Sequence, residues 1–454
     1  MKIIIEGAGE VGSHLAKMLS HEANDITVVD NDASRLQKLS STADVVTVLG
    51  DPSAVDVLRR AGAESADLMI AVNPFVPQDV NIVSALLSKK LGTKRVTARI
   101  NDVSYLSAEN KLMFKDMGID LMFYPEKIAS DEIVDLLKHD SSSDAMDFAR
   151  GKLQLTVFKV DDDSPILDMN LSEFVGTVSQ LSSGTAFRII AIARKNETLI
   201  PKPDTRFKYM DHIYIIARRE GIDTLMRFLG KSRVTIDSAM ILGGGEIGAM
   251  VAETLSGRME NVKIIEADRR RCQELVERLP DSVNVVNGDG RNSDFLVEES
   301  LKDFDSFLAV TENDEVNILA AVVAKKFGVG RVIAEVENLE YIRLAEEMGV
   351  DAVVNKKLIT AGRIFKFTLS DKVRFVKYMS GTDAEVLEYT VAPKSKITKG
   401  ALRDIDFPEN AIIGGVIRGG DAFIAVGDTR IEPYDRVAVF ALPDAVKQVD
   451  RFFK

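Results

Sequence analysis

Three glycines near the N-terminus, Gly7, Gly9 and Gly12, have the spacing that lets a backbone close around a phosphate group. Gly7 can make a tight turn, Gly9 leaves room for a pyrophosphate beside the main chain, and Gly12 allows a helix to pack closely on the preceding strand. The apolar run 3–5 before them indicates a buried strand, and a periodic helix follows. Because the start of a helix attracts phosphate, we predict a nucleotide-phosphate site at this turn.

An acidic residue, Asp30, ends the next apolar run, about twenty residues further along. A carboxylate in that place can accept hydrogen bonds from a ribose 2′-hydroxyl and would repel a 2′-phosphate. The combination favours NAD or an adenosine nucleotide over NADP. The simpler alternative is a tight strand-to-helix turn that holds no ligand.

The glycine motif and its acid occur a second time, and the first glycine and the acid both lie 236 residues after their first-half counterparts. The second set is Gly243, Gly245, Gly248 and Glu266. Shorter segments recur as well, among them Gly50-Asp51 as Gly288-Asp289 and Asp204-Thr205-Arg206 as Asp428-Thr429-Arg430. Recurrence of this kind along a whole chain indicates a tandem duplication.

Strand and helix patterns alternate through residues 1–140, which predicts a parallel, doubly wound, Rossmann-like sheet. A polar hinge, His139–Asp144, follows. Residues 150–230 show short strands and a helix, the pattern of a small α+β module. The predicted fold class is therefore α/β, a tandem duplication of a parallel-sheet domain in which each copy precedes a small module. The expected boundaries are 1–140, 150–230, 237–372 and 380–454.

Composition excludes several classes of protein. The 454 residues include 58 basic and 70 acidic side chains, a net charge of −12, without an extended basic block. A nucleic-acid partner is not expected, because it would need a clustered Lys/Arg surface. The single cysteine, Cys272, excludes an internal disulfide framework and a cysteine-based zinc site. No secretory signal or apolar stretch of roughly 18 residues is visible, so we expect a soluble protein of a reducing compartment.

With two glycine-motif sheet domains, each followed by a strand-rich module, the chain resembles the TrkA family of regulatory subunits of bacterial Trk potassium-uptake systems. The resemblance covers nearly the whole chain and rests on GAGEVG with Asp30 and GGGEIG with Glu266. The parts of the family are the RCK or KTN nucleotide-binding domain (TrkA-N) and the TrkA-C module. The resemblance implies a regulator and not an enzyme: a cytoplasmic, peripheral-membrane homo-tetramer. Its gating ring would control a TrkH- or TrkG-like potassium pore in response to NAD, NADH, ATP or ADP.

The resemblance also implies which residues contact the nucleotide. In the first half they are Gly7, Ala8, Gly9, Glu10, Val11, Gly12, Asp30, Asp51, Asn73, Pro74 and Arg99. In the second half they are Gly243, Gly245, Glu246, Ile247, Gly248, Glu266, Asp289 and Thr311. Asp51 would line the adenine side, Asn73-Pro74 would lie at the switch point of the sheet, and Arg99 would offer a cation. Their simpler alternatives are a helix N-cap, a turn and a surface ion pair, respectively.

The two halves differ at one of these positions. Alignment places Glu335 where the first half has Arg99, which removes a candidate cation and adds a negative charge. We expect unequal sites, with the second taking a less charged ligand or binding weakly. In the alternative, Glu335 points away and Arg331 or Arg269 supplies the charge.

Two other functions compete with this interpretation. An NAD-dependent oxidoreductase needs a positioned acid or base, commonly a histidine. The four histidines are His14, His21, His139 and His212, and none has a counterpart in the other half. We expect each to be solvated or packed, and we predict no catalytic or metal-binding residue. The other alternative is a nucleotide sensor that acts on a soluble partner. It would have the same sequence features as a potassium regulator, because the partner that distinguishes the two functions is a separate polypeptide.

Overall fold

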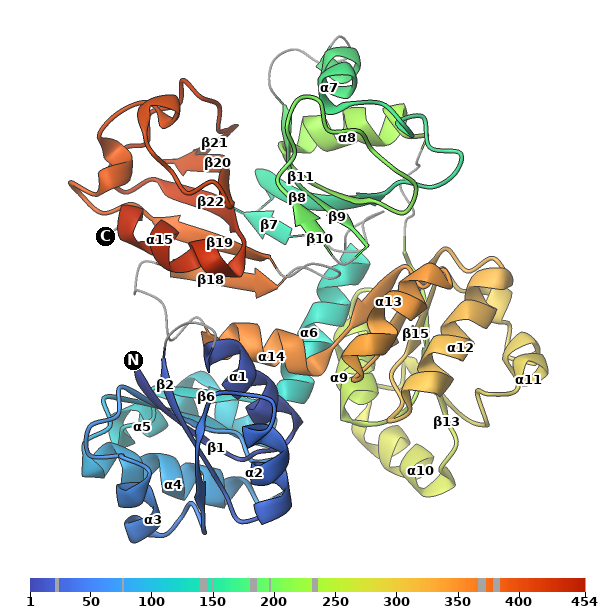
Figure 1. The fold of residues 1–454 in the computed structure, drawn as a ribbon. Helices are drawn as coiled ribbons and strands as arrows, with labels where there is room; N and C mark the ends of the chain where they lie inside the picture. The colour runs from blue at the N-terminus through green and yellow to red at the C-terminus, as the bar shows by residue number, and fades with distance from the viewer. Residues whose placement is uncertain are drawn as a thin grey trace. The chain divides into compact units, whose positions relative to one another are not determined.

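The computed structural model describes residues 1–20, 24–75, 77–138, 146–148, 151–179, 186–195, 197–230, 236–365, 373–378 and 384–453. Within these residues the chain forms two parallel and two antiparallel sheets that alternate along the sequence (Figure 1). The predicted α/β tandem duplication is therefore confirmed. The predicted hinge, which contains His139, and His21 lie outside the described residues.

The first sheet has six parallel strands in the spatial order β3-β2-β1-β4-β5-β6. The strands are Lys2–Glu6 (β1), Asp25–Asp30 (β2), Val46–Leu49 (β3), Leu68–Ala71 (β4), Arg95–Arg99 (β5) and Leu121–Phe123 (β6). The helices are Glu10–Ser20 (α1), Ala33–Ser40 (α2), Val55–Arg60 (α3), Gln78–Leu91 (α4), Ala108–Met117 (α5) and Pro125–Lys138 (α6). The strand order reverses between β1 and β4, and open α/β sheets bind ligands at such a point.

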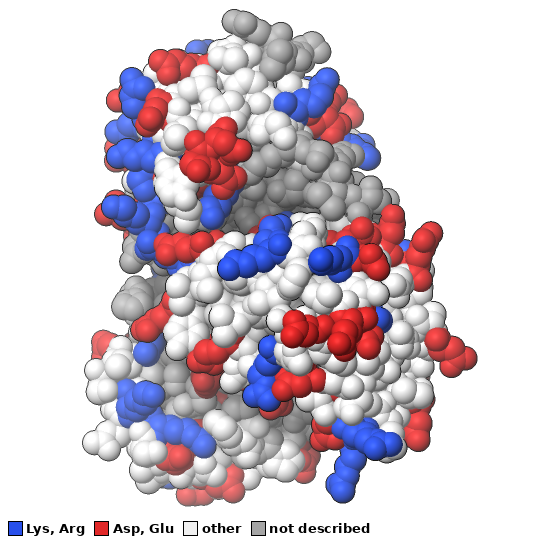
Figure 2. Space-filling view, turned by 90° about the vertical axis from the view of Figure 1, so that its right-hand side faces the viewer, with Lys and Arg blue, Asp and Glu red and all other residues white. Residues whose placement is uncertain are grey.

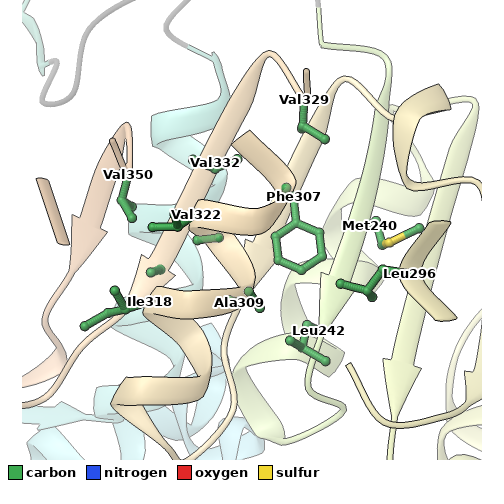
Figure 3. Close-up of a cluster of buried hydrophobic side chains, with 14 of the residues drawn as sticks. Met240, Leu242, Leu296, Phe307, Ala309, Ile318, Val322, Val329, Val332 and Val350 are labelled. Atoms are coloured by element: carbon green, nitrogen blue, oxygen red, sulfur yellow. The ribbon is translucent and has the colours of Figure 1, made fainter. Parts of the chain in front are cut away.

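The second sheet repeats this order as β14-β13-β12-β15-β16-β17. Its strands are Ser238–Leu242 (β12), Asn261–Glu266 (β13), Val283–Asn287 (β14), Ser306–Ala309 (β15), Arg331–Glu335 (β16) and Ala352–Val354 (β17). Its helices are Glu246–Ser256 (α9), Arg269–Arg278 (α10), Ser293–Glu298 (α11), Asp314–Lys326 (α12), Leu339–Glu347 (α13) and Lys356–Phe365 (α14). Figure 3 shows Phe307 of β15 among Met240, Leu296 and Val322, part of a buried apolar cluster. Strands covered by helices bury both faces, which explains their apolar runs.

Each small module is a five-stranded antiparallel sheet with helices, and the two sheets share one topology, β10-β9-β11-β8-β7 and β21-β20-β22-β19-β18. The first contains Met146–Phe148 (β7), Leu153–Lys159 (β8), Leu171–Ser179 (α7), Phe187–Arg194 (β9), Glu197–Leu199 (β10), His212–Ala217 (β11) and Arg219–Phe228 (α8). The second contains Val373–Tyr378 (β18), Glu385–Thr390 (β19), Ala411–Arg418 (β20), Asp421–Ile424 (β21), Arg436–Ala441 (β22) and Pro443–Phe453 (α15). The same ion pair recurs in both, Arg194–Asp211 at 2.7 Å and Arg418–Asp435 at 2.8 Å, which explains why these residues repeat in the sequence.

One buried apolar cluster contains residues of both modules. Leu155 and Tyr214 of the first belong to the same buried cluster as Val386 and Phe440 of the second. Arg188 of β9 reaches across, and its Nη1 donates to the carbonyls of Ile413 at 3.1 Å and Ala425 at 2.5 Å. Burial lowers the pKa of this guanidinium.

The chain divides into two compact units, residues 1–129 with 356–368 and residues 130–355 with 369–454. α14 follows the second sheet in the sequence but belongs to the first unit, where it packs against α1. α6 begins in the first unit and continues into the second, where Arg331 of β16 donates to the Leu136 carbonyl at 3.4 Å. Each half of the sequence thus supplies helical residues to the unit that contains the other half's sheet.

No helix of the described residues combines the length and the apolar character needed to span a bilayer. Figure 2 shows acidic and basic side chains interspersed over the face that it draws. That distribution agrees with the charge pattern of the sequence.

Candidate nucleotide-binding site

The first glycine loop joins β1 to α1 in the geometry that the motif predicts. Gly7 has a φ of +100°, and a Cβ atom added there would lie 2.7 Å from Asn73 Cα. A Cβ atom on Gly12 would lie 1.9 Å from the Gly7 carbonyl oxygen. Both positions therefore require glycine, for backbone conformation at Gly7 and for close packing at Gly12.

The loop after β4 lies over the first glycine loop. A Cβ atom added to Gly9 would be 3.1 Å from atoms of both Pro74 and Phe75. The Phe75 ring carries the Arg35 guanidinium above it, 3.6 Å from the ring centroid, a cation–π contact. The Gly9 side of this loop is therefore covered by an aromatic ring on which an arginine stacks.

Asp30 is buried and holds the loop through its carboxylate. One oxygen accepts the Ala8 N–H at 2.7 Å and the other accepts the Asp32 N–H at 2.8 Å. Arg35 Nη1 lies 3.8 Å from the second oxygen. An ionised carboxylate has about four acceptor positions. The Asp30 side chain is 0% exposed, so a ribose hydroxyl reaches it only if the side chains that cover it move.

The second loop has the same backbone frame. Gly243 has a φ of +107°, and a Cβ atom on Gly248 would lie 2.0 Å from the Gly243 carbonyl oxygen. Glu266 accepts the Gly244 N–H at 2.7 Å and the Asp268 N–H at 2.8 Å, as Asp30 does in the first half. A Cβ atom on Gly245 would meet no heavy atom within 4 Å, so this loop has open space where the first is covered.

An arginine spans the second loop. Arg271 donates from Nε to the Gly244 carbonyl and from Nη2 to Glu246, both at 2.8 Å. Arg278 contacts the same carboxylate at 3.0 Å. Burial alone would raise the pKa of Glu246, but the hydrogen bonds from the two arginines outweigh it and hold the pKa below its usual value.

Two polar residues lie at the ends of the fourth strands. Asn73 is buried and exchanges hydrogen bonds with Asn81, and its Nδ2 amide has no hydrogen-bond acceptor among the described residues. Thr311 occupies the equivalent place and hydrogen-bonds to Asn317. Both lie beside the first glycine of their loop, so the structure places these two predicted contact residues next to the glycine loops.

The remaining predicted residues already have protein partners. Asp51 is exposed and accepts hydrogen bonds from Ser53, which makes it a turn residue; the cap of α3 is Ala54, so its helix N-cap alternative does not hold. Arg99 forms an ion pair with Glu126 at 3.3 Å. Asp289 pairs with Arg291 at 2.7 Å.

The alternative cation Arg331 is buried and directed at the α6 backbone, and Glu335 is also buried. The arginine at the second loop is Arg271. Among the described residues no group of three or more His, Cys, Asp and Glu side chains has the arrangement of a metal site.

The profile of the TrkA-N domain matches residues 3–125 and 239–356, and that of the TrkA-C domain matches residues 155–230 and 386–454. The chain belongs to the TrkA family. Both glycine loops lie in the TrkA-N matches. Most strands of the two antiparallel sheets lie in the TrkA-C matches, and the edge strands β7 and β18 precede them.

Full-length relatives carry the name of this family. "Trk system potassium uptake protein TrkA" of Halomonas elongata is 33% identical over 459 residues, 100% of this chain and 99% of its own. "Trk system potassium uptake protein TrkA homolog 1" of Methanosarcina mazei is 31% identical over 463 residues, 100% of this chain and 100% of its own. The relative from Haemophilus influenzae is 32% identical over 100% of this chain and 99% of its own. These are names of potassium uptake proteins and not of enzymes, so the prediction of a non-enzyme is confirmed.

Solved structures with the same fold come from a channel. The crystal structure of the GsuK RCK domain superposes with a TM-score of 0.59 at 15% identity, over 100% of this chain and 94% of that chain. The GsuK channel bound to NAD gives a TM-score of 0.58 at 16% identity, over 100% of this chain and 78% of that chain. At this identity the likeness shows that this chain has the same fold as these RCK structures.

Sequence reasoning missed four residues beside the loops: Arg35, Phe75, Arg271 and Lys357. Arg35 and Arg271 are 236 residues apart, the same offset as the glycines, so the repeat contained a signal for both. Lys357 contacts Glu10 of the first loop from α14, which the sequence places after the second sheet. No pattern in the sequence points to that contact.

Proposed function

We propose that this chain is a nucleotide-binding regulatory subunit of a membrane potassium-uptake system, acting as a peripheral protein on the cytoplasmic face. The observation that carries the proposal is the pair of glycine loops, each at the switch point of a TrkA-N sheet and each held by a second-strand acid. The full-length relatives named as Trk potassium uptake proteins support it. The similar fold of the GsuK channel bound to NAD supports a nucleotide as the ligand.

In the proposed complex, NAD(H), ATP or ADP lies across the switch point of each sheet. The phosphates contact the N–H groups of the loop, and the adenosine ribose donates to Asp30 or Glu266. The unpaired Nδ2 amide of Asn73 is a donor for the ligand of the first site. Asp51, Pro74, Arg99, Asp289 and Thr311 remain proposed contacts at the rims.

We propose that the two sites open differently. In the first, the ligand must move the ring of Phe75 and the guanidinium of Arg35 away from Gly9. In the second, Arg271 must leave the carboxylate of Glu246 and can then contact the phosphate. Arg271 would thus supply the positive charge that the second site lacks because Glu335 replaces Arg99. Unequal ligand preference follows from these different coverings.

Calorimetric titration of the full chain with NADH, NAD, ATP and ADP tests this proposal. A Cβ atom at Gly245 meets no heavy atom within 4 Å, so Gly245→Val fills open space at the second loop, whereas Gly9→Val crowds the first loop. Each variant should lose one of two classes of binding. Gly257→Val, at the other end of α9 where added atoms also meet nothing, is the matched control and should bind as wild type. Absence of binding at millimolar ligand would contradict the proposal and leave the loops as purely structural turns.

We further propose that four chains form the gating ring that a TrkH- or TrkG-like pore requires. Corresponding helices of the two sheet domains carry exposed apolar side chains at corresponding positions. They are Val83, Met113 and Met117 on α4 and α5, and Leu319, Leu344 and Met348 on or at the end of α12 and α13. A repeated apolar face suits repeated domain contacts. Potassium flux through such a pore in vesicles, with and without the chain and each nucleotide, tests the partner.

A further inference from the structure

α14 places a lysine against the phosphate loop of the first sheet domain. Lys357 Nζ lies 2.6 Å from Glu10 Oε2. Glu10 is the first residue of α1, between Gly9 and Gly12 of the loop. The lysine side chain is only 13% exposed, whereas that of the glutamate is 62% exposed. The ammonium is therefore held in a packed position while its carboxylate partner faces solvent, where a phosphate would arrive.

One further contact and one electrostatic effect involve the start of α14. Lys356 lies 3.7 Å from Glu126, the carboxylate that also pairs with Arg99. Burial lowers the pKa of His14, one turn along α1, and the charges of Lys17 and Lys357 lower it further. The ammonium of Lys357 is thus close enough to α1 to act on two of its side chains.

The second loop obtains its cations from its own domain. Glu246, the counterpart of Glu10, pairs with Arg271 and Arg278, and both arginines belong to α10 of the same sheet domain. Within the described part of the chain, only the first loop has a glutamate whose cation comes from a helix that follows the other sheet in the sequence.

The residues just before Lys357 are fixed to the second sheet. Asn355 follows β17, and its Nδ2 donates to the carbonyls of Val336 at 2.7 Å and Glu337 at 3.1 Å. One residue separates Asn355 from Lys357. Two peptide bonds therefore connect the lysine at the first loop to a residue that is hydrogen-bonded at the carboxyl end of the second sheet.

We propose that Lys357 is the residue by which the first site senses the phosphate charge of its nucleotide and passes the signal to the second half of the chain. A di- or triphosphate at the loop competes with the Glu10 carboxylate for the ammonium, and a charge-assisted contact with phosphate is the stronger of the two. Movement of Lys357 carries the first turn of α14 and acts on Asn355. This inference rests on the proposed nucleotide function of the same loop.

Titrations in a chain carrying Gly245→Val, which isolates the first site, test the sensing role. Lys357→Met keeps the apolar stem and removes the charge. It should lower the affinity for ATP about tenfold, because one charge-assisted contact is lost, and it should lower the affinity for ADP less and that for NAD least. Glu10→Gln removes the competing carboxylate and should raise the affinity for ATP. Arg278→Met, which removes a cation from the other loop, is the matched control and should leave the first site unchanged.

Hydrogen exchange of the α14 amides tests the transmission. ATP should slow exchange over residues 356–365 in the chain with Lys357 and leave it unchanged in Lys357→Met. If the variant binds NAD, ADP and ATP with wild-type affinity, or loses all three equally, the sensing role is overturned while the nucleotide function stands. If the parent chain binds no nucleotide, the proposed function itself fails.

Discussion

The side chain of Glu6 shows how far single positions of the two copies have diverged. It is buried at the end of β1, where Ser84 of α4 hydrogen-bonds to it and burial raises its pKa to about 8. The counterparts, 236 residues along, are Leu242 and Ala320, which belong to the apolar core of the second domain. Ser84 also donates to the Val80 carbonyl at 2.7 Å, which suits a protonated Glu6 as the donor to the serine.

Glu6→Gln should stabilise the first sheet domain at alkaline pH. Because the pKa in the folded protein lies above the ordinary value of 4.5, the contribution of Glu6 to stability is complete below about pH 4.5 and is lost as the pH rises to about 8. The neutral amide does not ionise, so the free energy of unfolding at pH 8 should rise by up to about 4 kcal/mol, with little change near pH 4.5. Scanning calorimetry at the two pH values measures this.

The matched change in the other copy is Leu242→Gln. It buries an amide in an apolar cluster, so it should destabilise the second domain at every pH. A Glu6→Gln change in unfolding free energy that is the same at pH 4.5 and at pH 8 would contradict the raised pKa of Glu6.

At the scale of elements, the close approach of β20 to the sheet of the first module depends on glycine. A Cβ atom on Gly414 would lie 2.8 Å from Ile216 Cγ2, and one on Gly415 would lie 2.4 Å from Leu153 Cδ2. The two sheets can therefore share one core only because these positions have no side chain.

Gly414→Val should separate or strain the two modules without harming the strand, since valine favours β-structure. Overpacking of this kind costs about 1–3 kcal/mol. The melting transition of the paired modules should fall, and limited proteolysis between them should become faster. Gly400→Val, in the same module but 3.7 Å or more from other atoms, should melt as wild type does. Equal melting of the two variants would contradict the shared-core interpretation.

Several elements could be predicted from the sequence because local constraints determine them. Gly7 and Gly12 are fixed by close backbone contacts, and the repeat presents the glycine loop twice in one chain. The placement of α14 could not be predicted, because periodicity shows that a helix has an apolar face but not which domain covers it. The contacts of Arg35 with Phe75 and of Lys357 with Glu10 depend on loop and helix placement in space, which the order of residues does not encode locally.

For the whole molecule, the repeated apolar face on α4, α5, α12 and α13 predicts how copies associate. Met113 and Leu344 lie at corresponding positions and are each 48% exposed. Apolar side chains that are repeated on a surface indicate a contact with another protein surface. Met113→Glu combined with Leu344→Glu should convert the proposed tetramer into smaller species, measured by light scattering, while circular dichroism shows that each sheet domain stays folded.

Val276→Glu is the matched control for that experiment. Val276 is 63% exposed but lies on α10, away from the repeated face. It should leave the mass unchanged. A wild-type chain that is monomeric at micromolar concentration would contradict the proposed ring.

The helical residues that each half supplies to the opposite unit bear on the history of the chain. A polypeptide with a single copy could make this exchange only with a second molecule, as a domain-swapped pair does. Joining two copies end to end converts that exchange into an intramolecular one and removes the need for the copies to be identical. Substitutions such as Leu242 at the position that corresponds to Glu6, or Glu335 at the position that corresponds to Arg99, could then accumulate in one half alone. Gene fusion would thus have permitted two copies of one ancestral domain to become different from each other.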